Sequence, residues 1–213
     1  MPDDETLAFY AGHAADYVQH GSGRPNRHLR AFAAALAPRA RVLELGAGSG
    51  RDAAFMLAQG LDIDPTDASP ELAEQAGRRL GRAVRLMRFD QLDAENAYDG
   101  VWACASLLHA PAAELADDLA RIHTALRPGG LFVASFKAGK GEGRDAFGRY
   151  YNYPDADTLM ARYRAAAGWA ALTLETEAGS GYDRLPTQWL WVTARKESVS
   201  RKSGYRFCGS ETR

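Results

Sequence analysis

The chain has 213 residues, 46% of them hydrophobic and 25% charged, and this length and composition fit one globular domain large enough to bury a core. A formal net charge of −1 and a pI of about 6.5 give the molecule no strong electrostatic attraction to nucleic acid or to an anionic membrane. The first residues do not resemble a secretory signal, and no apolar run approaches the roughly 20 residues that span a bilayer, so we expect a cytoplasmic protein. The two cysteines cannot assemble a disulfide framework or a zinc site, so we expect no metal centre.

Helices and strands alternate through the middle of the chain. Hydrophobic spacing predicts helices over residues 26–37, 51–60, 69–80 and 111–126, and short β-rich runs predict strands over residues 41–45, 61–67, 83–87, 98–108 and 129–137. Ser69 is placed to cap the third of these helices, with Pro70 at its first position. This alternation predicts an α/β fold whose mostly parallel sheet is covered by helices on both faces.

The chain changes character after residue 137. Residues 137–154 are rich in glycine, charge and tyrosine and show no sustained periodicity, so we expect a long insert of the kind that forms a lid. A helix is predicted over residues 155–169, and strands over residues 170–177 and 186–195 are predicted to form a closing hairpin. Residues 1–196 are therefore expected to form a single domain, and the polar, aperiodic residues 197–213 a flexible tail.

A glycine-rich turn, "GAGSG" at residues 46–50, follows the first predicted strand and precedes a helix. Such a turn lies at the carboxyl edge of a parallel sheet, where α/β proteins bind ligands, and its glycines let a ligand approach the backbone. A dinucleotide site prefers glycine at the first, third and sixth positions, but the sixth position here is Arg51. Glu44, just before the turn, is a poor neighbour for pyrophosphate. It suits S-adenosyl-L-methionine (AdoMet), which carries an amino group and a sulfonium, better than NAD.

A second acid follows the turn by about 20 residues, the spacing at which nucleoside sites place a carboxylate that binds the ribose hydroxyls. Asp67 stands at the end of the second predicted strand and is the preferred candidate. Asp62 and Asp64 are rivals, but both precede the end of the strand. The spacing therefore indicates a nucleoside-containing ligand held between the first two strands.

Five stretches in order, "VLELGAGSG", "TDASPELAEQA", "FDQLD", "YDGVWACASLLH" and "ALRPGGLFVASF", make the segment from about Tyr10 to Arg195 resemble the bacterial class I AdoMet-dependent methyltransferases that act on small molecules. The resemblance implies a Rossmann-like three-layer sandwich. Its seven-stranded sheet would be mostly parallel with an antiparallel last strand, consistent with the closing hairpin. It also implies AdoMet as the cofactor and a small-molecule acceptor as the partner.

The resemblance also implies where AdoMet contacts the chain. The methionine part would meet Glu44 and the turn at Gly46, Ala47 and Gly48. Asp67 would bind the ribose, while Ala68, Phe89 and Asp90 would contact the adenine. Ala105 and Ser106 would approach the methionine and the sulfonium. The stretch "FDQLDAENAYD" departs from the family pattern, which leaves Gln91 as an alternative to Asp90. In the amino-terminal stretch "FYAGHAADYV", either Tyr10 or Tyr17 would reach the cofactor.

Methyl transfer from a sulfonium requires alignment of the acceptor and exclusion of water, and it needs a base only when the acceptor is protonated. His109, after "SLL" at a strand end, is the candidate general base because the pKa of histidine lies near neutrality, although histidine is frequent there in this family without catalysing. The insert supplies the candidates for an acceptor pocket, which would suit an anionic or aromatic molecule. They are Lys137, Arg144, Arg149, Tyr150, Tyr151 and Tyr153.

Two other classes of function remain open on the sequence alone. An NAD(P)-dependent oxidoreductase is opposed by Glu44 and Arg51, and a non-catalytic AdoMet-binding protein has no missing side chain that would reveal it. A macromolecular acceptor is also open. The near-neutral charge and the absence of a recognisable nucleic-acid module disfavour RNA or DNA, and we expect neither nucleic acid nor membrane as a partner.

Overall fold

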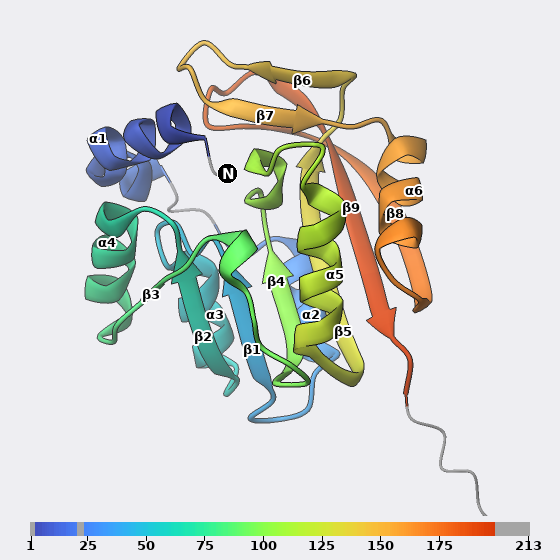
Figure 1. Ribbon diagram of the computed structural model, residues 1–213. Helices are drawn as coiled ribbons and strands as arrows, with labels where there is room; N and C mark the ends of the chain where they lie inside the picture. Colours follow the sequence, from blue (N-terminus) through green and yellow to red (C-terminus); the bar gives the residue numbers. More distant parts are fainter. Residues whose placement is uncertain (1–2, 21–23, 199–213) are drawn as a thin grey trace, which may run out of the picture.

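A computed structural model of the protein describes residues 3–20 and 24–198. Residues 199–213 of the predicted tail, Cys208 among them, lie outside the described residues, as does the side chain of Tyr17. The described chain forms a seven-stranded sheet between layers of helices, with a small two-stranded sheet above its upper edge in Figure 1. The predicted three-layer α/β architecture is confirmed.

The large sheet has the order β3-β2-β1-β4-β5-β9-β8. Its strands are β1 (Arg41–Leu45), β2 (Asp62–Asp67), β3 (Arg85–Leu86), β4 (Tyr98–Ala103), β5 (Leu126–Lys137), β8 (Trp169–Ser180) and β9 (Pro186–Lys196). The pairs β1–β2, β1–β4, β2–β3 and β4–β5 are parallel, whereas β9 runs antiparallel to both β5 and β8. The expected antiparallel last strand is therefore present. The strand predicted at residues 83–87 is reduced to two residues.

The helices are α1 (Asp4–His20), α2 (Arg27–Ala34), α3 (Arg51–Ala58), α4 (Pro70–Leu80), α5 (Leu115–Ala125) and α6 (Ala156–Ala166). Local capping explains several of their starts. The side chains of Asn26, Ser69 and Asp155 accept hydrogen bonds from backbone amides in the first turns of α2, α4 and α6. Gly81 ends α4 in the left-handed conformation, as glycine does at many helix ends.

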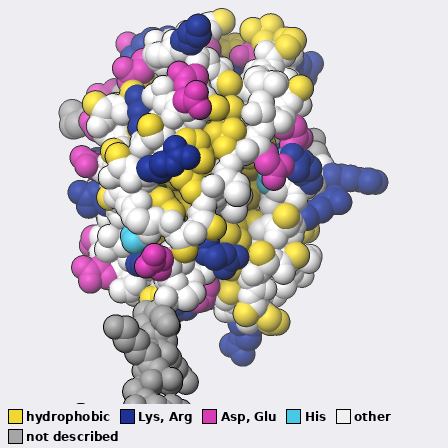
Figure 2. Space-filling model, turned by 90° about the vertical axis from the view of Figure 1, so that its right-hand side faces the viewer, with side chains coloured by type: hydrophobic (Ala, Val, Ile, Leu, Met, Phe, Trp, Pro, Cys, Tyr) yellow, Lys and Arg dark blue, Asp and Glu magenta, His cyan; other side chains and the backbone are white. Residues whose placement is uncertain are grey.

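Two hydrophobic cores flank the sheet, because its buried strands present apolar side chains to both faces. One core packs α5 and α6 against the sheet through Leu119, Ile122 and Tyr163, among others. The other packs α2 and α3 against the opposite face around Phe32, Met56 and Trp102. On the side of the molecule that carries α6 and β8, hydrophobic side chains gather along the middle, bordered by charged ones (Figure 2). Among the described helices, none is both long and apolar enough to cross a bilayer.

The insert differs from the expected aperiodic loop. Residues 137–154 contain a hairpin of β6 (Gly141–Arg144) and β7 (Tyr150–Tyr153), paired antiparallel. Asp145 organises its turn, since its Oδ1 accepts hydrogen bonds from the backbone amides of Phe147 and Arg149, both at 3.0 Å. The sequence did not reveal these strands because they lack apolar alternation: the hairpin rests on the domain through tyrosine and buried polar side chains.

Candidate functional site

Two pockets open side by side at the carboxyl edge of the sheet. The first, about 890 Å³ including space open to solvent, lies between the ends of β1, β2 and β4, the segment 87–90 after β3, and α1. The second, about 1020 Å³ measured in the same way, lies between the ends of β4 and β5, the hairpin and the β8–β9 loop. Both are lined by Tyr10, Cys104, Ala105 and His109. The first pocket lies where the strand order reverses between β1 and β4, the point at which open α/β sheets bind ligands.

The glycine turn forms the floor of the first pocket. Gly46, Gly48 and Gly50 have φ of 78°, 53° and 71°, the left-handed region that favours glycine. A Cβ on Gly46 would lie 2.5 Å from Cβ of Ser106, so a side chain there would collide with the end of β4. Gly46 and Gly48 line the pocket, whereas Ala47 is buried and donates its amide hydrogen to the Thr66 carbonyl at 2.8 Å.

Asp67 lies on the wall of the same pocket, next to Ala68. Its Oδ2 accepts from the Gly48 amide at 2.8 Å and its Oδ1 accepts from the Ser69 amide at 2.9 Å. Burial raises the pKa of Asp67, and those amide donors oppose the rise. A carboxylate oxygen can accept more than one hydrogen bond, so Asp67 ties the glycine turn to β2 and retains capacity to accept from a ligand.

Glu44 does not lie where a side chain in contact with a ligand would be expected. It is 2% exposed, lies beneath the glycine turn, and is not part of either pocket wall. Burial and the nearby Asp52 carboxylate raise its pKa well above the usual value, and Oε2 has no hydrogen-bond partner among the described residues. A contact between Glu44 and a ligand stays a prediction. The arrangement itself places an acid directly under the floor of the pocket.

The far end of the first pocket is built by the short 3₁₀ helix η1 (Phe89–Gln91) and by α5. Phe89 and Asp90 line the pocket, whereas the side chain of Gln91 turns back and accepts from the Arg88 amide at 2.9 Å. Between the two sequence alternatives, the structure therefore brings Asp90 to the wall. Asp118 also reaches it, and its pKa is raised to about 7 by burial and by neighbouring carboxylates. The sequence did not single out Asp118, since an acid on a helix reads as solvent-exposed.

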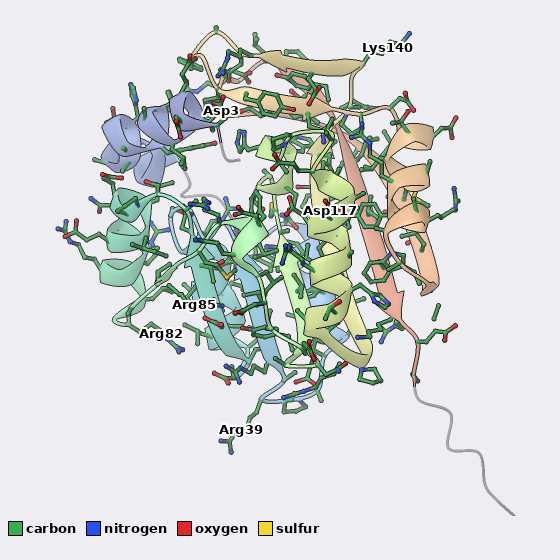
Figure 3. All side chains as sticks on the ribbon, in the orientation of Figure 1. Asp3, Arg39, Arg82, Arg85, Asp117 and Lys140 are labelled. Atoms are coloured by element: carbon green, nitrogen blue, oxygen red, sulfur yellow. The ribbon has the colours of Figure 1, made fainter. Side chains whose placement is uncertain are left out.

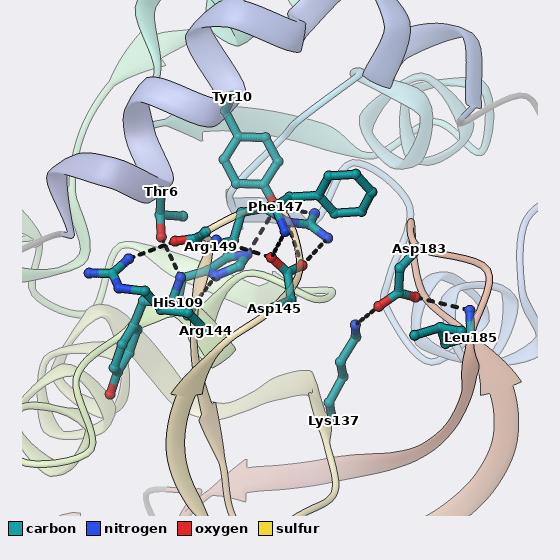
Figure 4. Close-up of polar contacts among 12 residues, drawn as sticks. Thr6, Tyr10, His109, Lys137, Arg144, Asp145, Phe147, Arg149, Asp183 and Leu185 are labelled. Carbon is teal, nitrogen blue, oxygen red and sulfur yellow. Dashed lines mark hydrogen bonds and ion pairs between the residues drawn. The ribbon is translucent and has the colours of Figure 1, made fainter.

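At the junction of the pockets, Tyr10 and His109 form a hydrogen-bonded pair (Figure 4). His109 Nδ1 lies 2.6 Å from the carbonyl oxygen of Tyr150, which accepts only, so Nδ1 carries the proton and Nε2 accepts from the Tyr10 hydroxyl at 2.9 Å. Burial lowers the pKa of His109 to about 4, and the Arg149 guanidinium adds to the effect. His109 is therefore neutral at pH 7.

The end of β4 completes the junction. Ala105 adopts a φ of 51° and donates its amide to Ser135 Oγ at 2.8 Å. This turn brings Ala105 and Ser106 to the first pocket, where Ser106 Oγ has no hydrogen-bond partner among the described residues. Cys104 lines both pockets, and burial raises the pKa of its thiol to about 12. Cys104 thus presents a neutral thiol to the junction, a position that its strand-like sequence did not reveal.

Three of the six residues predicted to hold an acceptor line the second pocket: Lys137, Arg149 and Tyr151. Tyr150 and Tyr153 do not. The Tyr150 hydroxyl donates to the Glu142 carboxylate and its carbonyl holds His109, while the Tyr153 ring stacks on Tyr151 with centroids 5.2 Å apart. Tyr150 and Tyr153 therefore contact residues of the pocket wall without lining the pocket themselves. Arg144, also suggested by the sequence, pairs with Asp3 at the surface.

The second pocket also has walls from β8, β9 and the loop between them. Glu177 to Tyr182, Trp189 and Trp191 all line it. In the sequence, Trp189 and Trp191 stand two positions apart in a strand, and this spacing places both side chains on the same face. Nothing in the sequence showed that this face meets the hairpin.

Comparisons with known proteins agree with this geometry. A family model described as a methyltransferase domain matches residues 43–132. The structure of Burkholderia thailandensis 1,6-didemethyltoxoflavin-N1-methyltransferase, with bound 1,6-didemethyltoxoflavin and S-adenosylhomocysteine, superposes with a TM-score of 0.72 and 27% identity over 92% of this chain and 88% of that one. Residues 43–132 thus match the methyltransferase domain family, and the described chain has the fold of class I AdoMet-dependent methyltransferases.

Some of the similar proteins are named for activities other than methyl transfer. The structure of the cyclase SpnF matches with a TM-score of 0.69 and 18% identity, over 92% of this chain and 95% of that one. The AdoMet-dependent Diels-Alderase iccD of Talaromyces variabilis is 33% identical over 109 residues, which make up 46% of this chain and 37% of that protein. The chain spans 37% or less of the length of the curated relatives it matches.

Proposed function

We propose that the protein binds AdoMet in the first pocket and transfers its methyl group to a small molecule in the second. The observation that carries this proposal is the shared wall: Tyr10, Cys104, Ala105 and His109 line both pockets, so a donor on one side and an acceptor on the other meet at one place. The Burkholderia thailandensis methyltransferase, whose structure holds 1,6-didemethyltoxoflavin and S-adenosylhomocysteine together, supports the same proposal.

The first pocket suits AdoMet chemically. Its floor is glycine backbone, and Asp67 offers carboxylate oxygens of the kind that bind ribose hydroxyls. Phe89 supplies an apolar ring, and the unpartnered Ser106 Oγ supplies a polar group near the junction. When bound there, AdoMet would supply an electrophilic methyl group.

The residues of the chain would position the acceptor and handle a proton. The Tyr10 hydroxyl donates to His109 Nε2 and accepts from Arg149 Nη1 at 3.4 Å, so its oxygen is held at the junction of the two pockets. A proton taken by Tyr10 would be relayed to His109 Nε2. A His109 pKa of about 4 makes this a weak base, so the pair suits an acceptor that loses its proton easily or needs to lose none.

A second activity is favoured by one observation, the similarity to the Diels-Alderase of Talaromyces variabilis. In that case the protein would bind AdoMet without consuming it, and the second pocket would hold a molecule that cyclises. Both candidates share the cofactor pocket. They differ in whether S-adenosylhomocysteine accumulates when the second pocket is occupied by its natural ligand.

The first test is calorimetric titration of the full chain with AdoMet, S-adenosylhomocysteine, NAD and NADP. We expect binding of the two sulfur nucleosides alone. Asp67→Ala should weaken that binding by roughly 1 to 3 kcal/mol, because ribose hydroxyls would lose their acceptor. Asp62→Ala is the matched control, since Asp62 is an exposed acid on the same strand, away from the pocket walls, and its removal should leave the affinity unchanged.

Methyl transfer itself is tested by mass spectrometry of an acceptor panel, with S-adenosylhomocysteine and the methylated product measured together. Product formation in equal amounts supports transfer. Rearrangement of a panel molecule with AdoMet intact supports the second activity instead. Binding of a dinucleotide, or unchanged AdoMet affinity in a folded Asp67→Ala variant, contradicts the assignment of the first pocket.

A further inference from the structure

We infer that the second pocket binds a planar, negatively charged acceptor whose anionic group is held by the ammonium of Lys137. The inference rests on the proposed function only in treating the molecule in this pocket as the acceptor. Binding of such a molecule is measurable without any methyl transfer. Four observations carry it: the sign of the charges on the pocket wall, the environment of Lys137, the aromatic walls, and the occupation of the aromatic cage by Arg149.

The wall of the second pocket carries an excess of positive charge. Its cationic side chains are Arg24, Arg51, Lys137 and Arg149. Its carboxylate, Glu177, is bonded through Oε2 to Arg27 Nε and His28 Nε2, both at 2.9 Å. Among the cations, Arg51 pairs with Asp52 at 2.8 Å, so the buried cations of the wall that an incoming ligand meets are Lys137 and Arg149.

The two buried cations differ in how well they are compensated. Arg149 is 1% exposed and makes two hydrogen bonds to Asp145 Oδ2, at 2.6 and 2.9 Å. Lys137 is 5% exposed, and its Nζ lies 3.5 Å from Asp183 Oδ2, at the outer limit of a hydrogen bond. Asp183 is held in its own turn by the Leu185 amide, which donates to Oδ1 at 3.1 Å (Figure 4).

A buried ammonium with one long contact is costly unless further acceptors reach it. The Tyr151 ring offers its face, with its centroid 4.6 Å from Nζ, but a ring face satisfies no N–H donor fully. An ammonium has three donors, so Lys137 has the capacity to bind an anionic oxygen or nitrogen in the pocket. This makes Lys137 the anchor for the charged end of the acceptor.

The remaining walls suit a flat molecule. The rings of Tyr10, Tyr151, Tyr182, Trp189 and Trp191 line the pocket. His28 stacks on Trp191 at 4.0 Å between centroids and covers one face of that indole. Aromatic side chains favour offset stacking or edge contacts with a planar partner. The pocket thus combines ring surfaces with a cation set among them.

A cationic acceptor is disfavoured by the same geometry. A cage of aromatic faces is the usual receptor for an ammonium group, and here such a cage is filled by the protein itself. The Arg149 guanidinium lies 4.8 to 5.8 Å from the ring centroids of Phe9, Tyr10, Phe147, Tyr151 and Tyr182. An ammonium ligand would have to share this site with a fixed positive charge.

The experiment compares 2-naphthoate with its neutral analogue 2-naphthamide by calorimetric titration of the full chain saturated with S-adenosylhomocysteine. We expect naphthoate to bind at least roughly tenfold more tightly, a ratio that corresponds to about 1.4 kcal/mol. Lys137→Met keeps most of the length of the side chain and removes the charge, so it should abolish the preference. Lys137→Arg restores a cation and should restore much of it.

Lys140→Met is the matched control, because Lys140 is exposed and extends away from the domain at the turn before β6 (Figure 3). It should keep the full preference. Equal affinities for the two probes, a preference for the amide, no measurable binding of naphthoate, or a preference that survives Lys137→Met in a folded protein would each overturn the inference. The affinity for S-adenosylhomocysteine, measured first in each variant, reports separately on the cofactor pocket, so failure of the proposed function is recognised independently.

Discussion

At the scale of single residues, the site depends on ionisable side chains whose surroundings change their protonation. Asp67 at the end of β2 is tied to backbone amides, whereas Glu44 at the end of β1 is buried beneath the turn with a raised pKa. His109 is held neutral between the Tyr10 hydroxyl and the Tyr150 carbonyl. These differences follow from burial and hydrogen bonding, since the residue types alone have ordinary pKa values.

The low pKa of His109 predicts a specific pH dependence of stability. Because its pKa is about 4 in the folded protein and near 6.5 in the unfolded chain, the unfolded chain binds more protons between these values. The contribution of His109 to stability is therefore fully present above about pH 6.5 and falls by on the order of 2–3 kcal/mol as the pH drops to 4. Urea unfolding of wild type and His109→Gln at pH 4, 5.5 and 7 measures it.

The difference in unfolding free energy between wild type and His109→Gln should shrink toward pH 4. Asp118 titrates in the same window in the opposite sense, because its raised pKa of about 7 makes the folded state bind the extra proton. That contribution is present in both proteins and cancels in the difference. A difference that stays constant with pH would show that His109 is not held neutral.

At the scale of elements, the β6–β7 hairpin is fixed to the domain by charge and aromatic contacts. Arg149 bonds Asp145 within the hairpin, and the two side chains are 1% and 6% exposed. The amide of Tyr150 donates to Thr6 Oγ1 of α1 at 2.8 Å, and Arg144 pairs with Asp3 near the surface. The hairpin thus joins α1 to the second pocket without a large apolar face of its own.

Breaking the buried pair should destabilise far more than breaking the exposed one. Arg149→Met leaves the Asp145 carboxylate buried without its cation, which we expect to cost about 3–5 kcal/mol in unfolding free energy. Arg144→Met, in the same hairpin, removes a surface pair and should cost less than about 1 kcal/mol. Urea unfolding compares the two variants. Similar losses would mean that the buried pair does not hold the hairpin.

At the scale of the whole molecule, the first pocket is closed by the amino-terminal segment. Asp3, Thr6, Leu7 and Tyr10 line the pocket, although they are more than 30 residues away in sequence from the glycine turn that forms its floor. A ligand in this pocket would contact α1 and the carboxyl edge of the sheet at once. Occupation should therefore stabilise the docking of α1 on the domain.

Hydrogen exchange measures this coupling. At a concentration of S-adenosylhomocysteine about 100 times its dissociation constant, openings of α1 that destroy the pocket should be opposed by about 2.7 kcal/mol, so the amides of residues 7–12 should exchange roughly a hundredfold more slowly. Core amides of β5 that exchange only by global unfolding serve as a reference. Unchanged exchange in α1 alongside measured binding would show that the helix is not part of the binding wall.

The sequence by itself determined the α/β architecture, the glycine turn, the place of Asp67 and the closing hairpin, whereas the antiparallel last strand came from the resemblance to the family. These features are local or periodic: a strand followed by glycines and a helix fixes its own geometry, and parallel strands bring their carboxyl ends to one edge. For the same reason Asp67 could be preferred over Asp62 and Asp64, because position along a strand decides which side chain reaches the edge.

Only the tertiary structure decided which residues meet. The hairpin strands have no apolar alternation, so their pairing depends on Asp145 and on contacts with α1. The Tyr10–His109 bond joins residues 99 positions apart, and the burial that lowers the pKa of His109 comes from the packed domain. Burial of Glu44 and the position of Lys137 on the wall of the second pocket likewise arise from packing. Contacts of this range depend on how separate elements dock, and no short pattern in the chain encodes them.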